Sequence, residues 1–307
     1  MAGQELYAEL RPKAFAIAYR MIGSVSEAED VVQEGLLRLH RTLQDGQPLE
    51  SPAAYLSTVV TRLAIDHLRA VRRRRETYTG EWLPEPIITD TSDDPAQHAE
   101  MADSLSLAFL VLLESLSPEQ RAVLLLHDVF DYDHSQVAEI IGKSPDNVRQ
   151  LARRARRHIE QGRPRFQASR EHQQELARRF FAAAQEGDLP ELEALLAHDV
   201  VLTGDGGGKA PALARPMRGR NRVARTLVKG IGIATRIPGV HLRPAEVNGS
   251  PGALLLDGGE RVIGVMVLDV GRDQILGINS IANPDKLAHL GPTADLRSLL
   301  RTRPRGG

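Results

Sequence analysis

The sequence predicts a multidomain chain in which two all-α domains are followed by a small α+β domain. Before residue 164, apolar residues recur at the three- and four-residue spacing of helices that bury one face. After it, glycine-rich and β-branched segments take over, and the runs 261–270 and 274–282 flank the turn Gly271-Arg272-Asp273. The length of 307 residues allows two or three domains, each with a core of its own.

The composition excludes several classes of protein. The chain has no cysteine, so it has no disulfide, no zinc–thiolate site and no thiol nucleophile. No apolar run approaches the roughly 18 residues of a membrane-spanning helix, and the N-terminus lacks the apolar region of a secretory signal. We therefore expect a cytoplasmic protein that does not enter a membrane.

The charge is balanced overall but unevenly distributed. The formal net charge is −1, and residues 1–166 hold 20 basic and 25 acidic residues, which argues against coating nucleic acid by bulk charge. The arginines are instead concentrated at 69–75 and at 149–157. Two local basic stripes on an acidic body predict weak DNA binding by the chain alone, and stronger binding when a partner supplies further contacts.

Three helices are predicted before residue 77. The first covers 5–22, and the second begins where Ser26 and Glu29 have the spacing of a capping box. Acidic residues crowd the first turns of the second helix, where they complement the helix dipole. Ser51-Pro52 opens the third helix, which runs to residue 76 and ends in arginines.

Residues 133–161 predict a helix-turn-helix. Two helical patterns meet at Gly142, which can take the left-handed backbone that ends a helix, while Ser144 caps the next helix and Pro145 suits its first turn. The exposed side of the second helix carries Asn147, Arg149, Gln150, Arg153, Arg154, Arg156 and Arg157. Such a face suits base edges and phosphates. An ordinary helical hairpin with a solvated arginine face remains the alternative.

The order of these segments resembles a known family. EAEDVVQEGLLRL at 27–39 followed by the 51–76 helix is similar to region 2 of an extracytoplasmic-function (ECF) sigma factor of the sigma-70 family, and 105–160 is similar to region 4. Gly35 departs from the bulkier residues usual in the family at that position.

The resemblance implies three contact surfaces. The acidic second helix would face the clamp helices of RNA polymerase through Glu29, Asp30, Gln33 and Glu34. The third helix would melt and read the −10 element through Tyr55, Thr58, Arg62, Asp66, Arg69, Arg72 and Arg73. The helix-turn-helix would read the −35 element through Ser144, Asn147, Arg149, Gln150, Arg153, Arg154 and Arg157.

Three further motifs resemble a Sigma-J-like subgroup with a fused SnoaL-like, cone-shaped domain: YTGEWLPEP at 78–86, DGGGK at 205–209 and NPDKL at 283–287. The resemblance implies that the C-terminal domain packs on the linker and tunes activity in place of a separate anti-sigma factor. The residues expected in this contact are Trp82, Pro84, Asp205, Lys209, Asn283, Asp285 and Lys286. We expect Trp82 to lie near Asp285 and Lys286.

These observations give five predicted segments. They are region 2 at 1–77, the linker at 78–104, region 4 at 105–166, the SnoaL-like regulatory domain at 167–291 and a flexible tail at 292–307.

Catalytic chemistry is not supported. A phosphate loop at 205–209 lacks the required glycine at Thr203 and the magnesium-binding hydroxyl at Ala210, and the ten histidines have no metal-ligand spacing. Asp205, His241 and Asp257 could line a cone as acid–base groups, but acids beside glycine are usually turn residues. We expect no catalytic residue, metal site or cofactor.

The sequence therefore predicts a promoter-specificity subunit that binds the clamp and flap regions of core RNA polymerase and promoter DNA. An unidentified small ligand could bind its C-terminal domain. One alternative is a ligand-sensing helix-turn-helix regulator that acts without polymerase, for which tight duplex binding by the isolated protein would be evidence. Another is a cyclase-type enzyme with a DNA-binding appendage, for which turnover that depends on Asp205 or Asp257 would be evidence.

Overall fold

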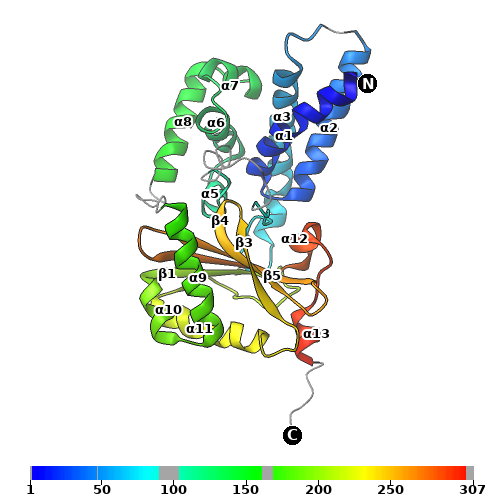
Figure 1. Ribbon diagram of the computed structural model, residues 1–307. Coiled ribbons are helices and arrows are strands. Elements are labelled where there is room, and N and C mark those ends of the chain that lie inside the picture. The colour runs from blue at the N-terminus through cyan, green and yellow to red at the C-terminus, as the bar shows by residue number, and fades with distance from the viewer. Residues whose placement is uncertain (1, 47, 90–103, 161–168, 302–307) are drawn as a thin grey trace. The chain divides into compact units, whose positions relative to one another are not determined.

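The computed structural model describes residues 2–46, 48–89, 104–160 and 169–301. The chain divides into two compact units (Figure 1). The helical unit comprises Met1–Glu76 and Phe109–Arg163, and the α+β unit comprises Thr77–Ala108 and Pro164–Gly307. Regions 2 and 4, which we expected as separate domains, thus belong to one unit, and the described part of the linker belongs to the C-terminal unit.

The helical unit begins with α1 (Ala2–Ile22), α2 (Val25–Gln44) and α3 (Pro52–Glu76). The capping box expected at Ser26 and Glu29 is wrong. Gly23 takes a φ of 76°, and Ser24 caps α2 by accepting from the Glu27 N–H at 3.3 Å. The helix therefore starts earlier, because a left-handed glycine that ends α1 leaves Ser24 in the extended backbone that a cap needs.

Close packing of α2 against α3 explains why a glycine stands at position 35. It lies in α2 opposite α3, and a Cβ at this position would come within 2.9 Å of Val60 Cγ2 and 3.1 Å of Leu56 Cδ1. Both partners are buried, so neither can move aside without disturbing the core. The glycine therefore allows α2 and α3 to approach closely, at the expense of helix propensity in α2.

The second half of this unit begins at Phe109 within α5 (Leu107–Leu113) and continues with α6 (Pro118–Asp128), α7 (His134–Ile141) and α8 (Pro145–Glu160). A capping box opens α6, in which the side chains of Ser117 and Gln120 bond each other's backbone. A buried arginine of α6, Arg121, donates to the Met21 carbonyl at 2.6 Å and to the Leu113 carbonyl at 2.6 Å. It joins the end of α1 to the helices of region 4.

The α+β unit is built on a six-stranded sheet in the order β2-β1-β6-β5-β4-β3. The strands are β1 (Leu196–Asp205), β2 (Met217–Arg218), β3 (His241–Val247), β4 (Ser250–Leu256), β5 (Val262–Val270) and β6 (Ile275–Ile281). Strands β1 and β6 are parallel, and the other neighbours are antiparallel. The predicted hairpin of β5 and β6 is confirmed, whereas β2 and β3 were not foreseen.

Both faces of the sheet are covered by segments of this unit. One face packs on α9 (Arg170–Glu186), α10 (Leu189–Leu195) and α11 (Arg220–Ala234), with Phe180 and Leu227 in the shared core. The other face buries two residues from the 77–108 segment, Leu83 and Leu107, among Val265, Val267 and Ile281. The linker thus supplies part of the core of this unit.

The chain ends with α12 (Pro284–Leu287), a 3₁₀ turn η1 (Ala288–Leu290) and α13 (Leu296–Arg301). Part of the segment that we expected to be a flexible tail is therefore structured. The Val262 N–H donates to the Pro292 carbonyl at 2.8 Å, and Leu296 and Leu299 pack on the cluster that contains Ile237 and Ile263. Apolar burial of a short amphipathic helix explains why this stretch is ordered.

We predict that Gly35→Leu lowers the free energy of unfolding of the helical unit by about 1–3 kcal/mol, because the side chain must displace Val60 and Leu56. Thermal unfolding followed by circular dichroism measures the change. Gly232→Ala is the control: it is also a helix-interior glycine, in α11, but an added Cβ meets nothing within 4 Å. That variant should be neutral or more stable by up to about 1 kcal/mol. An equal response of both variants would contradict the packing role of Gly35.

Candidate promoter, polymerase and regulatory sites

The helix-turn-helix has the geometry that its turn residues predict. Gly142 has a φ of 67° and ends α7 by donating to the Ala138 carbonyl, and the Asn147 N–H donates to Ser144 Oγ at 3.3 Å. The buried side of α8 carries Val148, Ala152, Ala155 and Ile159. Residues of one side of the helix are thereby fixed in the core, which leaves the opposite side to solvent.

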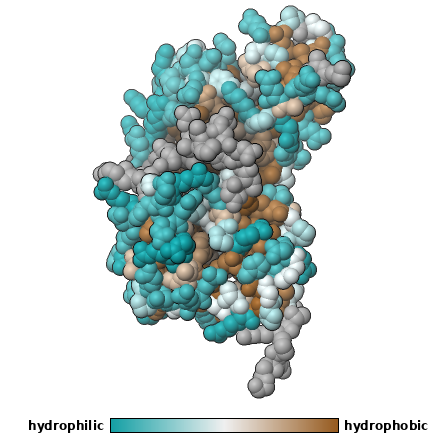
Figure 2. All heavy atoms as spheres, viewed as in Figure 1, coloured by the Kyte–Doolittle hydropathy of each residue, from teal (hydrophilic) through white to brown (hydrophobic). Residues whose placement is uncertain are grey.

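The exposed side of α8 forms one polar surface, and Figure 2 shows hydrophilic residues over this helix. All seven residues that we expected at a −35 element are exposed there: Ser144, Asn147, Arg149, Gln150, Arg153, Arg154 and Arg157. Arg149 is paired with Asp146 on the same helix. Arg156, also on this helix, is paired with Asp128 through a 2.9 Å bond from Nε and a second bond from its terminal nitrogen.

Two of the residues that we expected at the −10 element, Tyr55 and Thr58, make side-chain hydrogen bonds within the helical unit. The Tyr55 hydroxyl lies 3.0 Å from Thr42 Oγ1, and the Thr58 hydroxyl donates to the Ala54 carbonyl at 2.9 Å. Both side chains are half-buried. The side chains of Arg72 and Arg73 lie outside the described residues.

Arg62 and Arg69 of α3 bond to the helix-turn-helix half of the same unit. Arg62 donates from Nε to the Ile140 carbonyl at 2.7 Å and from a terminal nitrogen to the Glu139 carbonyl at 2.9 Å. These carbonyls close the C-terminal end of α7, where a cation is favourable. Arg69 pairs with Asp66 at 3.1 Å and with Glu119 of α6.

The ion pair of Arg69 and Glu119 affects both groups. The hydrogen bond to Glu119 raises the pKa of Arg69 above its ordinary value. Partial burial acts to raise the pKa of Glu119, but the hydrogen bond from Arg69 outweighs it, and the pKa is lowered. Since the pKa of Glu119 is lowered by folding, the pair is present above the ordinary carboxyl pKa and is lost as pH falls below it.

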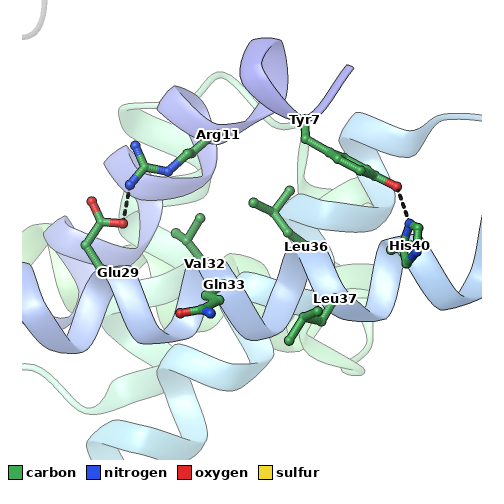
Figure 3. A pocket seen from close by; sticks show the side chains of 8 residues that line it. All are labelled: Tyr7, Arg11, Glu29, Val32, Gln33, Leu36, Leu37 and His40. Atoms are coloured by element: carbon green, nitrogen blue, oxygen red, sulfur yellow. Dashed lines mark hydrogen bonds and ion pairs between the residues drawn. The ribbon is translucent and has the colours of Figure 1, made fainter. Parts of the chain in front are cut away.

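A groove of about 460 Å³ lies between α1 and α2 (Figure 3). Its floor is apolar and includes Val32, Leu36 and Leu37, and two polar bridges cross it. Arg11 pairs with Glu29 at 2.5 Å, and the Tyr7 hydroxyl lies 2.9 Å from His40 Nδ1. Figure 3 shows these bridges on either side of the apolar residues.

The residues expected at polymerase lie on or beside this groove. Glu29 and Gln33 line it, while Glu34 is paired with Arg38 at 2.7 Å and Asp30 is exposed. Leu37 was not foreseen as a surface residue, although 43% of it is exposed. The sequence did indicate an exposed leucine here, because Leu36 and Leu37 are adjacent and adjacent residues of a helix cannot both point to the same buried face.

A buried ion pair holds the linker in the C-terminal unit. Asp205 at the end of β1 and Lys286 of α12 are 2.6 Å apart, with side chains 0% and 7% exposed. Asp205 Oδ2 also accepts from the Leu83 N–H at 2.9 Å, and Lys286 donates to the Leu83 carbonyl. One linker residue is thus bonded on both sides of its backbone by the two partners of the pair.

Tyr78 and Asn283 complete the same network. The Tyr78 hydroxyl donates to Asp205 Oδ1 at 2.6 Å and accepts from Asn283 Nδ2 at 2.9 Å. Burial raises the pKa of Tyr78 well above its ordinary value, and the bond to Asp205 acts in the same direction. Gly207, with a φ of 55°, passes so close that a Cβ would lie 2.3 Å from Asn283 Nδ2. Gly207 of the DGGGK motif therefore serves this contact.

The expected contact of Trp82 is confirmed in part. Lys286 Nζ lies 4.1 Å from the centre of the Trp82 ring, a cation–π distance. Asp285 instead pairs with Lys209, and both of those side chains are exposed. Pro84 is buried in this unit.

Asn248 is a linker contact that we did not foresee. It is fully buried, and its side chain accepts from the Ile87 N–H at 2.9 Å and donates to the Leu105 carbonyl at 3.1 Å. The Asn-Gly pair, with φ values of 53° and 70°, forms the turn between β3 and β4. The Asn-Gly pair could have been recognised in the sequence as a hairpin turn, because this pair favours tight turns between two strands.

The acids considered for catalysis do not meet in a cavity. Asp205 is used by the linker, Asp257 accepts from Arg261 and from the Gly259 N–H, and His241 is exposed beside Glu260. Within the described residues, no group of three acidic or histidine side chains could hold a metal ion. In the same part of the chain, no helix is long and apolar enough to cross a membrane.

We predict that Asp205→Asn lowers the free energy of unfolding of the C-terminal unit by about 3–5 kcal/mol, because it leaves the charge of Lys286 buried without its partner. Urea unfolding followed by emission from Trp82, the single tryptophan, measures the change. The double variant Asp205→Asn with Lys286→Met should lose less free energy of unfolding than the sum of the losses in the two single variants. Strictly additive losses would contradict the coupling. Asp257→Asn, a buried carboxylate away from the linker, should leave the native emission unchanged.

Comparisons with known proteins agree with this architecture. Sigma-70 region 2 matches residues 6–74, and Sigma-70, region 4 matches residues 106–159. The chain is 38% identical to the ECF RNA polymerase sigma factor SigJ of Mycobacterium tuberculosis over 291 residues, which is 90% of each chain. It is 30% identical to the probable ECF RNA polymerase sigma factor SigI of the same species over 278 residues, covering 88% of this chain and 90% of that one.

The crystal structure of the Mycobacterium tuberculosis extracytoplasmic function sigma factor SigJ matches with a TM-score of 0.74 and 36% identity. The match covers 93% of this chain and 98% of that one, so it includes the C-terminal unit as well as the helical one. The predicted fold class, helical sigma regions followed by an α+β SnoaL-like domain, is confirmed. The chain therefore belongs to the extracytoplasmic-function RNA polymerase sigma factors.

Proposed function

We propose that this sigma factor directs core RNA polymerase to promoters through three surfaces. The exposed side of α8 reads the −35 element, α3 reads the −10 element, and the groove between α1 and α2 receives the polymerase clamp. The observation that carries this proposal is the division of α8 into a buried apolar stripe and an exposed face of arginine, asparagine and glutamine. Such side chains match phosphate oxygens and base edges in a major groove.

The structure corresponds to a closed form of the helical unit. We assign Arg62 and Arg69 to the −10 element. In this structure Arg62 donates to backbone carbonyls of α7, and Arg69 is paired with Glu119. A guanidinium cannot give the same N–H groups to a protein carbonyl and to a nucleotide. Promoter binding therefore requires α3 and the helix-turn-helix to separate, and the ion pair with Glu119 opposes that step.

We propose that the C-terminal domain regulates this separation in the same polypeptide, without a separate anti-sigma factor. The linker connects α3 to α5, and its Leu83 and Ile87 are held by Asp205, Lys286 and Asn248. A linker that is bound to this domain has less free length between regions 2 and 4 than a released one. Docking of the linker thus favours the closed form.

The cyclase alternative loses its support, because Asp205 and Asp257 are both saturated by structural hydrogen bonds. The regulator that works without polymerase is disfavoured by the similarity to sigma factors over nearly the whole chain.

We predict that Arg153→Ala reduces transcript yield by about tenfold, since loss of a base or phosphate contact costs about 1–3 kcal/mol of binding. The assay is in vitro transcription with bacterial core RNA polymerase and the promoter upstream of the protein's own gene. Arg178→Ala is the control, because this arginine is exposed on α9 and pairs with Glu175 of the same helix. If neither variant nor the native chain yields a transcript or binds core polymerase, the proposed function fails.

We predict that Glu119→Gln raises transcript yield severalfold, because Arg69 loses its charged partner and the closed form is destabilised. The matched control is Glu139→Gln. Glu139 meets Arg62 through its backbone carbonyl, so its side-chain charge is not needed for that contact. Equal yields from the two variants would count against an inhibitory role of the ion pair.

A further inference from the structure

The C-terminal unit contains a cavity of about 370 Å³ between α11 and the sheet. Its walls come from β1, α11, β4, β5 and β6, with Leu227, Ile231 and Met266 among the larger side chains. Its volume falls in the range of roughly 300–1,000 Å³ that is typical of small-molecule sites.

Small residues form part of the cavity lining. Gly204, Gly230 and Gly264 are part of the lining, together with several alanines. Gly230 lies within α11, and a Cβ there would meet nothing within 4 Å, so backbone packing does not demand a glycine.

Few of the side chains that line the cavity are polar. Among the described residues, its side chains are aliphatic, methionine or absent, apart from the hydroxyls of Thr226 and Ser280. Thr226 gives its proton to the Arg222 carbonyl at 2.8 Å, so its oxygen can only accept a further bond. A charged ligand would be desolvated here without a counter-ion, whereas a neutral apolar molecule with one or two polar atoms would not.

The cavity wall continues into the network that holds the linker. Gly204 and Ala282 line the cavity, and each precedes a residue of that network, Asp205 and Asn283. The Ala282 N–H donates to the Asp205 carbonyl at 2.8 Å. Leu213, another lining residue, lies against the linker, since a Cβ on Gly80 would be 4.0 Å from its carbonyl. Filling the cavity therefore supports the surface on which the linker docks.

We propose that this cavity binds a neutral, largely apolar small molecule, and that its occupancy strengthens docking of the linker on the C-terminal domain. The second half of the inference rests on the proposed regulatory function of the linker, and the first half does not. Ligand binding to the docked form alone shifts the equilibrium toward it.

Binding is tested on the full chain with the neutral fluorescent dye N-phenyl-naphthylamine, and with the anionic dye anilinonaphthalene sulfonate for comparison. The neutral dye should bind saturably, and the anionic dye much more weakly. Thr226→Leu should weaken binding of the neutral dye by about tenfold or more, because the larger side chain occupies part of the cavity.

Thr235→Leu is the matched control. Thr235 is the C-cap residue that follows α11, is half-buried and donates to the Ile231 carbonyl at 2.9 Å, as Thr226 does to the carbonyl four residues before it, but it is not among the lining residues of the cavity. It should bind the dye like the native chain. Absence of saturable binding, or equal binding by the two variants, would overturn the site, and melting temperatures show whether either variant is misfolded.

Coupling is tested with decanol, which is neutral and transparent, and with decanoate as the charged counterpart. Decanol should displace the dye and reduce quenching of Trp82 by acrylamide, and decanoate should do neither at the same concentration. Displacement of the dye with unchanged quenching would overturn the coupling and leave the site. Neither measurement uses polymerase or DNA, so their failure is distinct from failure of the proposed function.

Discussion

The buried ion pair of Asp205 and Lys286 is the interaction on which the C-terminal unit depends. Two charges without water are costly, and the cost is offset only when each charge also has further hydrogen-bond partners. Those partners are supplied mostly by the linker: the Leu83 backbone on both of its sides and the Tyr78 hydroxyl. The pair therefore needs the linker as much as the linker needs the pair. This mutual dependence explains why a segment between regions 2 and 4 belongs to the C-terminal unit.

Two constraints then act on the same helical unit. Within it, Arg62, Arg69 and Arg121 join the helices of region 2 to those of region 4. Outside it, the docked linker removes free length between the two regions. In the proposed mechanism both favour the closed form, and the protein leaves that form when α3 binds promoter DNA. The apolar cavity beside the docking network offers a place where a small molecule could set the balance, by supporting Gly204, Leu213 and Ala282.

Much of this account was predictable from the residues. The turn at Gly142, the cap at Ser117 and the hairpin at 271–273 each follow from local chemistry, and the structure has all three. The cap at Ser26 was wrong because two serines compete there, and the left-handed Gly23 decides in favour of Ser24. The bonds of Arg62 and Asn248 could not be read from local patterns, since their partners lie 77 or more residues away in the chain.

Amide hydrogen exchange of the full chain tests the central claim most directly. The Leu83 N–H is bonded to Asp205 in a buried setting, and the Ile87 N–H is bonded to Asn248 in a partly buried one. If linker docking is part of the fold, these two amides should be protected about as strongly as amides in the middle of β5, and Asp205→Asn should abolish the protection of both. Exchange at the rate of an unstructured chain in the native protein, with β5 still protected, would contradict the account.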